Sequence, residues 1–350
     1  MGNHCRRICA GICALLMLLA SGYTFAEKEK VDQRNFRKIL AYIDENKPME
    51  LELRELTLKP KEIAQLREHM PEGSVLHFTT KWLGVSVSDT DVNLNLTAIR
   101  RRPSLADVEQ LIRLLPGLRK VDFSGGHRMY NDDMIRLTEE FPDITFIWKI
   151  ELNSRRNVCT TDTAYSTFNS PLYNPPRVTS KQLELLRYAP GLKALDLGHN
   201  DIGSLDFLRF FPELELLILA DNPVKDIEMI GTLKHLKYLE IFNTQISDLS
   251  PLANCTELLD LNLSYCPRVK DLSPLDSLPA LERFWGVEMR GLTREEKARF
   301  TEVRPQTTVN FTAEHATADG WRDHPRYAHY VECLKNHQWI PFDEMKTAEE

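Results

Sequence analysis

The sequence predicts an α/β solenoid in which short parallel strands stack side by side and form one concave sheet. Five leucine-anchored segments recur with steps of 22, 22, 22 and 23 residues. Apolar and polar residues alternate in each segment, which indicates a short half-buried strand. In the first four segments an Asn, Thr or Cys follows this strand. A fixed period of this length is typical of stacked structural repeats. The segments begin at Leu192, Leu214, Leu236, Leu258 and Leu281.

The first repeat, LKALDLGHNDI, shows how each unit is expected to fold. Leu195 and Leu197 point into the core, while Asp196 points outward. Asn200 and Asn222 follow the first two strands, and we expect their amides to hydrogen-bond backbone groups at the turn. Return segments such as DLSPLANCTEL are too short for a long helix, and their proline suits a single tight turn. The convex side is therefore expected to carry 3₁₀ or irregular turns.

The D-L-S-P-L element and the 22-residue period resemble the internalin-like class of bacterial extracellular leucine-rich-repeat proteins. The resemblance covers about residues 190–290, within a repeat domain predicted over residues 178–310. It implies a leucine-rich-repeat arc with a parallel concave sheet. It also implies a role in macromolecular recognition, because a solenoid presents its outward strand residues as adjacent columns.

The first 26 residues predict a secretory signal. Arg6 and Arg7 precede an apolar run over residues 8–20, and Thr24-Phe25-Ala26 places small residues at a cleavage site after Ala26. Thirteen apolar residues are fewer than the roughly 20 that span a bilayer. We therefore expect a secreted or cell-envelope protein without a transmembrane anchor.

The balance of charges argues against a nucleic-acid partner. Removal of residues 1–26 takes away two arginines and no acid, so the net charge changes from −7 to −9. A protein that binds nucleic acid would instead need a basic stripe.

Residues 27–177 contain a longer and weaker internal duplication of about 71 residues. REHMPEGSVLHFTTKWL (67–83) matches TEEFPDITFIWKIEL (138–152), and VSDTDV (87–92) matches TTDTAY (160–165), which pairs Asp89 with Asp162. The interpretation is a set of irregular, long-period α/β units that extend the solenoid, with a junction in residues 153–177. The alternative is a separate sandwich or binding domain.

Residues 311–350 predict a C-terminal helical cap with an aromatic tail that covers the last repeat. Tyr327, Tyr330, Val331 and Leu334 have helical spacing, and Trp339 and Phe342 follow them. In the same segment His329, Cys333 and His337 fall at i, i+4 and i+8, so they are weak candidates for zinc ligands. Their spacing matches no known finger, and the prediction is therefore that the chain holds no metal and no cofactor.

Catalytic motifs are absent from the sequence: it contains no GxSxG, HExxH, GxGxxG or P-loop pattern. Gly125-Gly126-His127 follows an expected strand, and the interpretation is a turn between strand and helix. We therefore predict that the protein is not an enzyme. The alternative is a hydrolase with a site in the N-terminal units.

The outward columns of the repeats supply the candidate binding residues. Aromatic and acidic side chains gather on the later strands. Such a surface suits a protein or peptide partner that carries apolar and basic groups. The protein itself is expected to be a monomer. The candidates are Tyr238, Glu240, Phe242, Asp260, Asn262, Tyr265, Arg283 and Trp285. The position before each turn adds His199, Asp221, Asn243, Tyr265 and Glu288.

Two alternatives stay open for these aromatic residues. They could stack on the sugars of a cell-envelope polysaccharide instead of contacting a protein. The C-terminal segment could also fold over them and bury them, since large exposed apolar patches are unusual on monomers.

Overall fold

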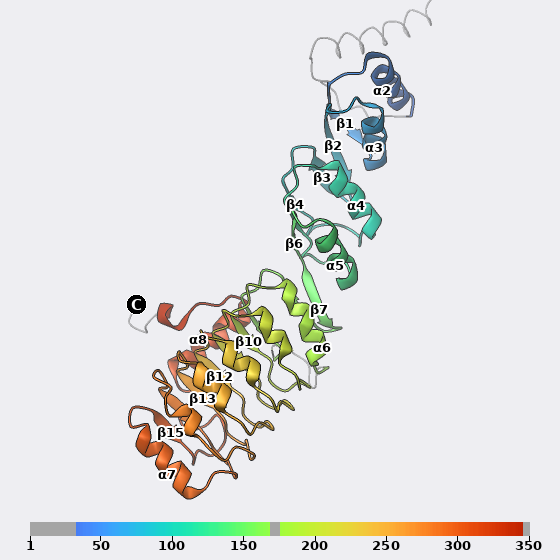
Figure 1. The fold of residues 1–350 in the computed structure, drawn as a ribbon. Helices are drawn as coiled ribbons and strands as arrows, with labels where there is room; N and C mark the ends of the chain where they lie inside the picture. Colours follow the sequence, from blue (N-terminus) through green and yellow to red (C-terminus); the bar gives the residue numbers. More distant parts are fainter. Residues whose placement is uncertain (1–32, 169–175, 346–350) are drawn as a thin grey trace, which may run out of the picture. The chain divides into compact units, whose positions relative to one another are not determined.

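The computed structural model describes residues 33–168 and 176–345, which form two compact units (Figure 1). Unit 1 ends at Trp148, and unit 2 begins at Lys149. This boundary precedes the junction expected in residues 153–177, because a strand at residues 164–166 already belongs to the sheet of the repeats. The predicted signal, residues 1–26, lies outside the described residues. Within the described ranges, no helix is both long and apolar enough to cross a bilayer.

Unit 1 contains two small sheets, with helices connecting most of their strands. β2 pairs with β1 in parallel and with β3 in antiparallel, and β4, β5 and β6 form a separate parallel sheet. The elements are α2 (Gln33–Asn46), β1 (Glu50–Leu58), α3 (Pro60–His69), β2 (Val75–Trp82), β3 (Val85–Ser88), β4 (Asn93–Asn95), α4 (Leu105–Leu114), β5 (Lys120–Asp122), α5 (Asn131–Glu140) and β6 (Thr145–Ile147).

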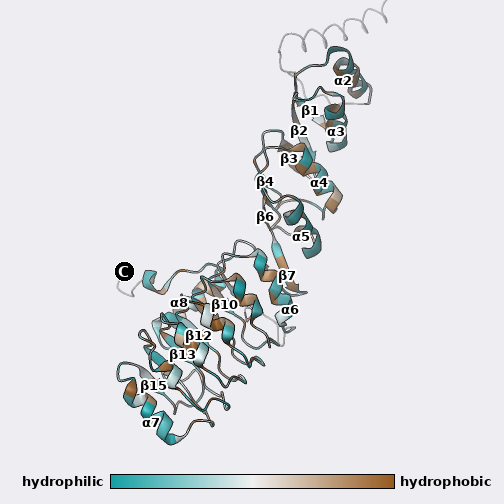
Figure 2. Ribbon diagram, in the orientation of Figure 1, coloured by the Kyte–Doolittle hydropathy of each residue, from teal (hydrophilic) through white to brown (hydrophobic). Residues whose placement is uncertain are grey.

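The helices of unit 1 begin and end where local chemistry dictates. Ser104 caps α4 by accepting a hydrogen bond from the Asp107 amide at 3.2 Å, and the Asp107 side chain completes a capping box. Most of α5 is hydrophilic (Figure 2), and only Met134 and Leu137 of this helix are buried. α3 packs against β2 and α5 against β6, while neighbouring helices also pack on one another.

Unit 2 is built on a seven-stranded parallel sheet in the order β15-β14-β13-β12-β11-β10-β9. A hairpin of β7 and β8 precedes it, and short turns connect its strands. The strands are β7 (Lys149–Asn153), β8 (Arg156–Cys159), β9 (Ala164–Ser166), β10 (Ala194–Asp196), β11 (Leu216–Ile218), β12 (Tyr238–Glu240), β13 (Asp260–Asn262), β14 (Arg283–Trp285) and β15 (Thr308–Asn310). The helical segments are α6 (Ser180–Leu183), η1 (Glu184–Tyr188), η2 (Asp206–Phe210), η3 (Glu228–Thr232), η4 (Ser250–Asn254), η5 (Ser273–Leu275), α7 (Arg294–Val303), α8 (Pro325–Lys335) and η6 (Phe342–Glu344).

The predicted repeat geometry is confirmed over the central strands. The return segments form 3₁₀ turns, and successive strands pair in parallel with a constant register. Asn222 is buried; its amide donates to the carbonyl oxygens of Leu197 (2.9 Å) and Leu219 (3.1 Å), while its side-chain oxygen accepts from the Ile202 amide at 3.0 Å. The asparagine therefore satisfies backbone groups of two neighbouring repeats at the turn.

The second sheet of unit 1 uses the same backbone pattern as the repeats. The Val92 carbonyl accepts hydrogen bonds from the amides of Arg119 and Lys120 at the start of β5. At the start of β10 the Thr163 carbonyl accepts from the amides of Lys193 and Ala194 in the same way. Both units thus contain short parallel strands that pair through the same hydrogen-bond pattern, although the sequence of unit 1 is irregular.

The duplication in the sequence coincides with repeated elements. Helices α3 and α5, strands β3 and β8, and strands β4 and β9 each begin 71 residues apart. The step of 71 pairs Asp91, and not Asp89, with Asp162. Each of these two aspartates accepts from the amide three residues before it, Ser88 at 2.8 Å and Cys159 at 2.9 Å. Both side chains therefore stabilise the turn between a hairpin and the next strand.

The C-terminal helix does not cap the last repeat. β15 and α7 follow that repeat, and Phe300 of α7 packs on Phe284 of β14 at 4.9 Å between ring centroids. α8 instead lies against the outward face of the sheet near β9 and β10 (Figure 1). The expected helical face is also rotated, because Val331 is exposed while Cys333 is buried.

Candidate functional site

The outward face of the unit 2 sheet is covered by the C-terminal segment, defined here as residues 311–345. Six of the eight predicted binding residues are buried, so this surface is not open to a partner. The buried six are Tyr238, Glu240, Asp260, Asn262, Arg283 and Trp285. Phe242 and Tyr265 are half-buried at the margin of the same cluster. The alternative in which the segment folds over the aromatic residues is the one that the structure shows.

Trp321 is the central side chain of the covered face, and none of its surface is exposed. Its ring centroid lies 5.6 Å from that of Tyr238 and 5.2 Å from that of Trp285. Tyr330 of α8 lies 4.9 Å from Tyr238. The sheet and the segment thus enclose a second apolar core outside the repeats.

Buried charges join the segment to the sheet next to this core. Asp260 accepts hydrogen bonds from Arg326, from Nε to Oδ2 at 2.6 Å and from Nη2 to Oδ1 at 2.9 Å. Arg283 of the neighbouring strand donates from Nε to Asp260 Oδ1 at 2.6 Å. One carboxylate therefore pairs with two guanidinium groups, both largely buried.

Neutral hydrogen bonds continue the contact along the segment. Asn262 donates to the Ala316 carbonyl at 2.7 Å, and the Trp285 indole donates to the Ala318 carbonyl at 3.0 Å. At the far end the Trp339 amide donates to the hydroxyl of Thr163, just before β9, at 2.7 Å. The segment therefore spans the sheet from β14 to β9 and satisfies outward polar groups on the way.

Glu240 is a buried carboxyl group that forms no ion pair with the cations of residues 33–168 and 176–345. It accepts a hydrogen bond from the Trp321 indole at 2.7 Å and another from the Tyr238 hydroxyl. Burial raises the pKa of Glu240, and the charge of Asp196 adds to this effect, while the two hydrogen bonds oppose it. Burial likewise raises the pKa of Asp196. Both groups favour the protonated form in the folded state.

We expect Glu240→Gln to stabilise the protein at neutral and alkaline pH. The folded-state pKa lies above the unfolded value, so the wild type loses stability as pH rises from about 4.3 through the raised pKa. Glutamine keeps an acceptor for Trp321 but carries no charge. The advantage of the variant in urea unfolding should therefore be absent at acid pH and grow with pH by about 1.4 kcal/mol per unit of pKa elevation. Glu228→Gln, at an exposed site, serves as the control; an advantage that is equal at all pH values would contradict this account.

The three weak metal candidates do not converge. His329 Nε2 lies 2.7 Å from the Ile340 carbonyl oxygen, and Cys333 Sγ lies 3.7 Å from the same nitrogen. α8 ends at Lys335, so His337 leaves the helical face and its Nδ1 pairs with Asp162 at 3.2 Å. This hydrogen bond raises the pKa of His337. The three side chains secure the C-terminal segment, and among the described residues no cluster of three or more ligands is suited to a metal ion.

A row of side chains stays open along the edge of the sheet where the strands end. Each residue of this row occupies the left-handed region, with φ between 53° and 58°, one position before the buried turn residue. His199, Asn243 and Glu288 are exposed, whereas Asp221 and Tyr265 are half-buried and Tyr265 packs against the covered cluster. We call this set the margin row, and it consists of His199, Asp221, Asn243, Tyr265 and Glu288.

Hydrogen bonds order the first half of the margin row. His199 Nδ1 lies 2.8 Å from Asp221 Oδ2, and the Asn243 amide donates to the other oxygen of Asp221. Phe168, with 69% of its surface exposed, lies beside His199 at 5.9 Å between ring centroids. An open groove of about 650 Å³ adjoins the row, with Arg177, Asp201 and Gln245 in its lining. The row, with the neighbouring ring of Phe168 and the groove beside it, thus offers acidic and basic side chains and an exposed aromatic ring on an ordered support.

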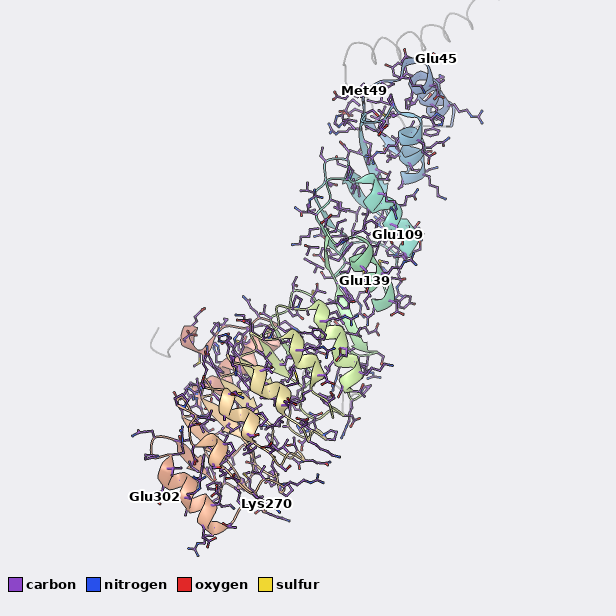
Figure 3. All side chains as sticks on the ribbon, in the orientation of Figure 1. Glu45, Met49, Glu109, Glu139, Lys270 and Glu302 are labelled. Carbon is purple, nitrogen blue, oxygen red and sulfur yellow. The ribbon has the colours of Figure 1, made fainter. Side chains whose placement is uncertain are left out.

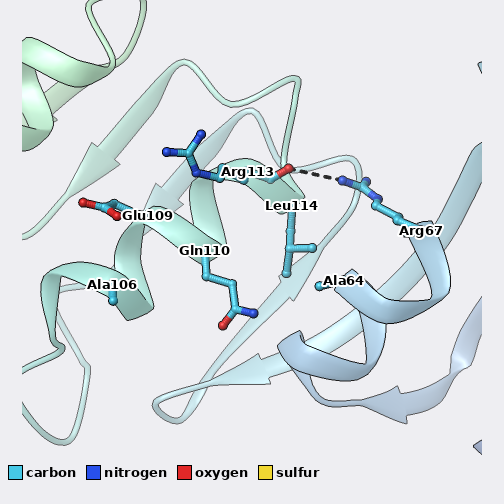
Figure 4. Close-up of a pocket in the computed structure, with 7 residues that line it drawn as sticks. All are labelled: Ala64, Arg67, Ala106, Glu109, Gln110, Arg113 and Leu114. Carbon is cyan, nitrogen blue, oxygen red and sulfur yellow. Dashed lines mark hydrogen bonds between the residues drawn. The ribbon is translucent and has the colours of Figure 1, made fainter. Parts of the chain in front are cut away.

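A second groove, of about 520 Å³, lies between α3 and α4 of unit 1 (Figure 4). Arg67 donates there to the Arg113 carbonyl at 3.3 Å. Arg113 pairs with Glu140 at 2.5 Å, and Glu109 lies 3.7 Å from Arg136. Two of the charged groups around this groove, Arg113 and Glu109, are thus paired within unit 1, and it is the weaker candidate for a ligand site.

Comparisons with known proteins support the repeat assignment. The family model "Leucine Rich repeats (2 copies)" matches residues 212–254 and 234–277, so the chain contains leucine-rich repeats in this region. No curated protein sequence matches the chain.

Several solved structures are similar to this chain. Internalin C2 of Listeria monocytogenes is 21% identical over 60% of this chain and 84% of its own, with a TM-score of 0.35. Another internalin of that organism (inlF) is 16% identical, covers 75% and 74% of the two chains and has a TM-score of 0.38. A leucine-rich-repeat protein of Leptospira interrogans is 15% identical, covers 75% and 72% and has a TM-score of 0.34.

Proposed function

We propose that this is an exported, non-catalytic leucine-rich-repeat protein that recognises a protein or peptide through the margin row. Leucine-rich repeats generally mediate protein–protein interaction, and the match over residues 212–277 supports that class of function. Export rests on the signal predicted in residues 1–26, and a chain that stays inside the cells with residues 1–26 uncleaved would count against it.

We place the binding site at the margin row, and not on the outward strand residues, because side chains of the row are exposed. The outward strand residues Tyr238 and Trp285 are buried, so neither a peptide nor a sugar reaches them while the C-terminal segment is in place. His199, Asn243 and Phe168 are exposed and are held by a sheet whose interior is fully buried. A binding site on such a support loses little conformational entropy when a partner binds.

We expect the variant Phe168→Ala/His199→Ala/Asn243→Ala to weaken binding at least tenfold, about 1.4 kcal/mol, because it removes an aromatic anchor and two ordered polar groups. Peptides selected from a displayed library against the wild type are measured by biolayer interferometry against both proteins. The matched control is Lys225→Ala/Glu228→Ala, which changes two exposed residues that do not line the groove. Unchanged affinity of the margin variant, or an equal loss in the control, would rule out the margin row as the site.

A further inference from the structure

Two neighbouring loops of unit 1 carry a cluster of cations in an acidic chain. Arg100, Arg101 and Arg102 follow β4 and are exposed, and Arg128, which follows β5, is half-buried. The chain as a whole has a net charge of −7. The ion pairs described in unit 1 use other cations, namely Lys47, Arg54, His69, His77, Arg113 and Arg136. The positive charge of the two loops is therefore available to a ligand.

Buried residues hold both loops in place. Ile99 and Met129 are 4% and 5% exposed, and the Arg100 amide donates to the Leu83 carbonyl at 3.3 Å. Gly125 lies so close to the first loop that a Cβ atom there would stand 2.0 Å from the Thr97 carbonyl oxygen. Glycine is thus required at position 125 for the two loops to pack together. The arginines are displayed from an ordered surface.

An exposed aromatic ring completes the cluster. Tyr130, at the end of the second loop, is 59% exposed. The Arg102 guanidinium lies 3.9 Å from the centroid of its ring and joins the two loops through a cation–π contact. The remaining surface of the ring faces solvent beside the unpaired arginines.

We propose that this arginine patch, formed by Arg100, Arg101, Arg102, Arg128 and Tyr130, binds an acidic polysaccharide that carries carboxylate groups. Guanidinium groups form paired hydrogen bonds with carboxylates, and several of them suit a polymer that repeats its charge. The open surface of Tyr130 offers a platform for the apolar side of one sugar ring. The exposed side chain of Asn95 on the neighbouring strand is polar and fits a hydroxyl-rich ligand.

The composition of the patch favours a polysaccharide over other polyanions. A protein partner would require apolar anchors, but Ile99 and Met129 are buried and only Tyr130 is exposed. Single-stranded nucleic acids stack successive bases on several aromatic rings, and this patch has one. The patch belongs to unit 1, whereas the margin row belongs to unit 2, so this inference does not depend on the proposed function.

Isothermal titration of the full chain with polygalacturonate at low salt tests the proposal. We expect the variant Arg100→Gln/Arg101→Gln/Arg128→Gln to bind at least tenfold more weakly, because three charge-assisted contacts are lost. The matched control Arg268→Gln/Lys270→Gln/Arg294→Gln removes the same charge from exposed sites of unit 2 and should stay within twofold. Lys270, labelled in Figure 3, projects from unit 2. Tyr130→Ala should weaken binding as well, and Tyr130→Phe should preserve it.

The outcomes distinguish the patch from general charge effects and from the margin row. An equal loss in the patch and control variants, or no binding by the wild type, overturns the proposal. Tighter binding of poly-glutamate or single-stranded DNA at equal charge overturns the choice of polysaccharide. His199→Ala/Asn243→Ala should leave polygalacturonate binding unchanged, so a failure of the proposed function would not be mistaken for a failure of this site. All substituted side chains in the patch are at least partly exposed, and unchanged thermal melting would show that the variants fold.

Discussion

Trp321→Ala is expected to lower the free energy of unfolding of unit 2 by about 3–5 kcal/mol. The side chain is fully buried between Tyr238 and Trp285, so its removal leaves a large cavity in the core beneath the C-terminal segment. It also removes the indole that donates to Glu240, which leaves a buried carboxyl group with fewer partners.

Urea unfolding and hydrogen exchange measure the effect of Trp321→Ala. The amides of α8 should exchange faster, because the segment loses its central anchor. Val331→Ala changes an exposed residue of the same helix and should alter stability by less than about 0.5 kcal/mol. A change of stability below about 1 kcal/mol in the tryptophan variant would mean that the segment does not depend on this core.

Asp260→Ala is expected to cost about 3–5 kcal/mol, because it removes the carboxylate that two buried guanidinium groups share. Arg326 then keeps its pairing with Glu282, from Nη2 to Oε2 at 2.6 Å, whereas Arg283 loses its carboxylate partner. Asp260 has no exposed surface, and both Arg283 and Arg326 donate to it. Thermal or urea unfolding at neutral pH measures the loss. Asp248→Ala, at an exposed turn, is the control for loss of a carboxylate.

A compensating variant separates the buried charges from the general packing of this site. Asp260→Leu/Arg283→Met/Arg326→Met removes all three charges and keeps comparable volume, so it should recover most of the stability lost in Asp260→Ala. If the triple variant is no more stable than the single one, the loss arises from packing and not from unpaired charge.

The part of the fold that the sequence predicts well is the part with a strict period. Leu195 and Leu197 are buried and Asn222 bonds the turn, because each repeat buries its own short apolar pattern against a near-identical neighbour. In unit 1 parallel strands recur without the 22-residue period, so the step of 71 residues is the sequence signal for them. Even there the sequence alignment paired Asp89 with Asp162, because SDT and TDT are similar in sequence. The hydrogen bond to the amide three residues earlier, which makes Asp91 the true equivalent, is not visible in the sequence.

The candidate site was predicted less well, and for a physical reason. The periodic pattern identifies which residues leave the strands outward, but it does not reveal what lies over them. Glu240, Asp260 and Trp285 were assigned to a partner, whereas Trp321, Arg326 and Ala318 of the same chain satisfy them. The complementary composition of the C-terminal segment, aromatic and basic residues opposite aromatic and acidic ones, was the available signal.

The hydrogen bond between Thr163 and Trp339 joins positions 176 residues apart. Stacked repeats ordinarily touch only their neighbours, so they can form from any point and fray from either end. Here the final stretch of chain returns to the first strand of the array, which gives unit 2 a high contact order. The fold of unit 2 therefore cannot be completed on the ribosome until Trp339 has emerged. A premature stop within α8 would disturb the first strand as well as the last residues.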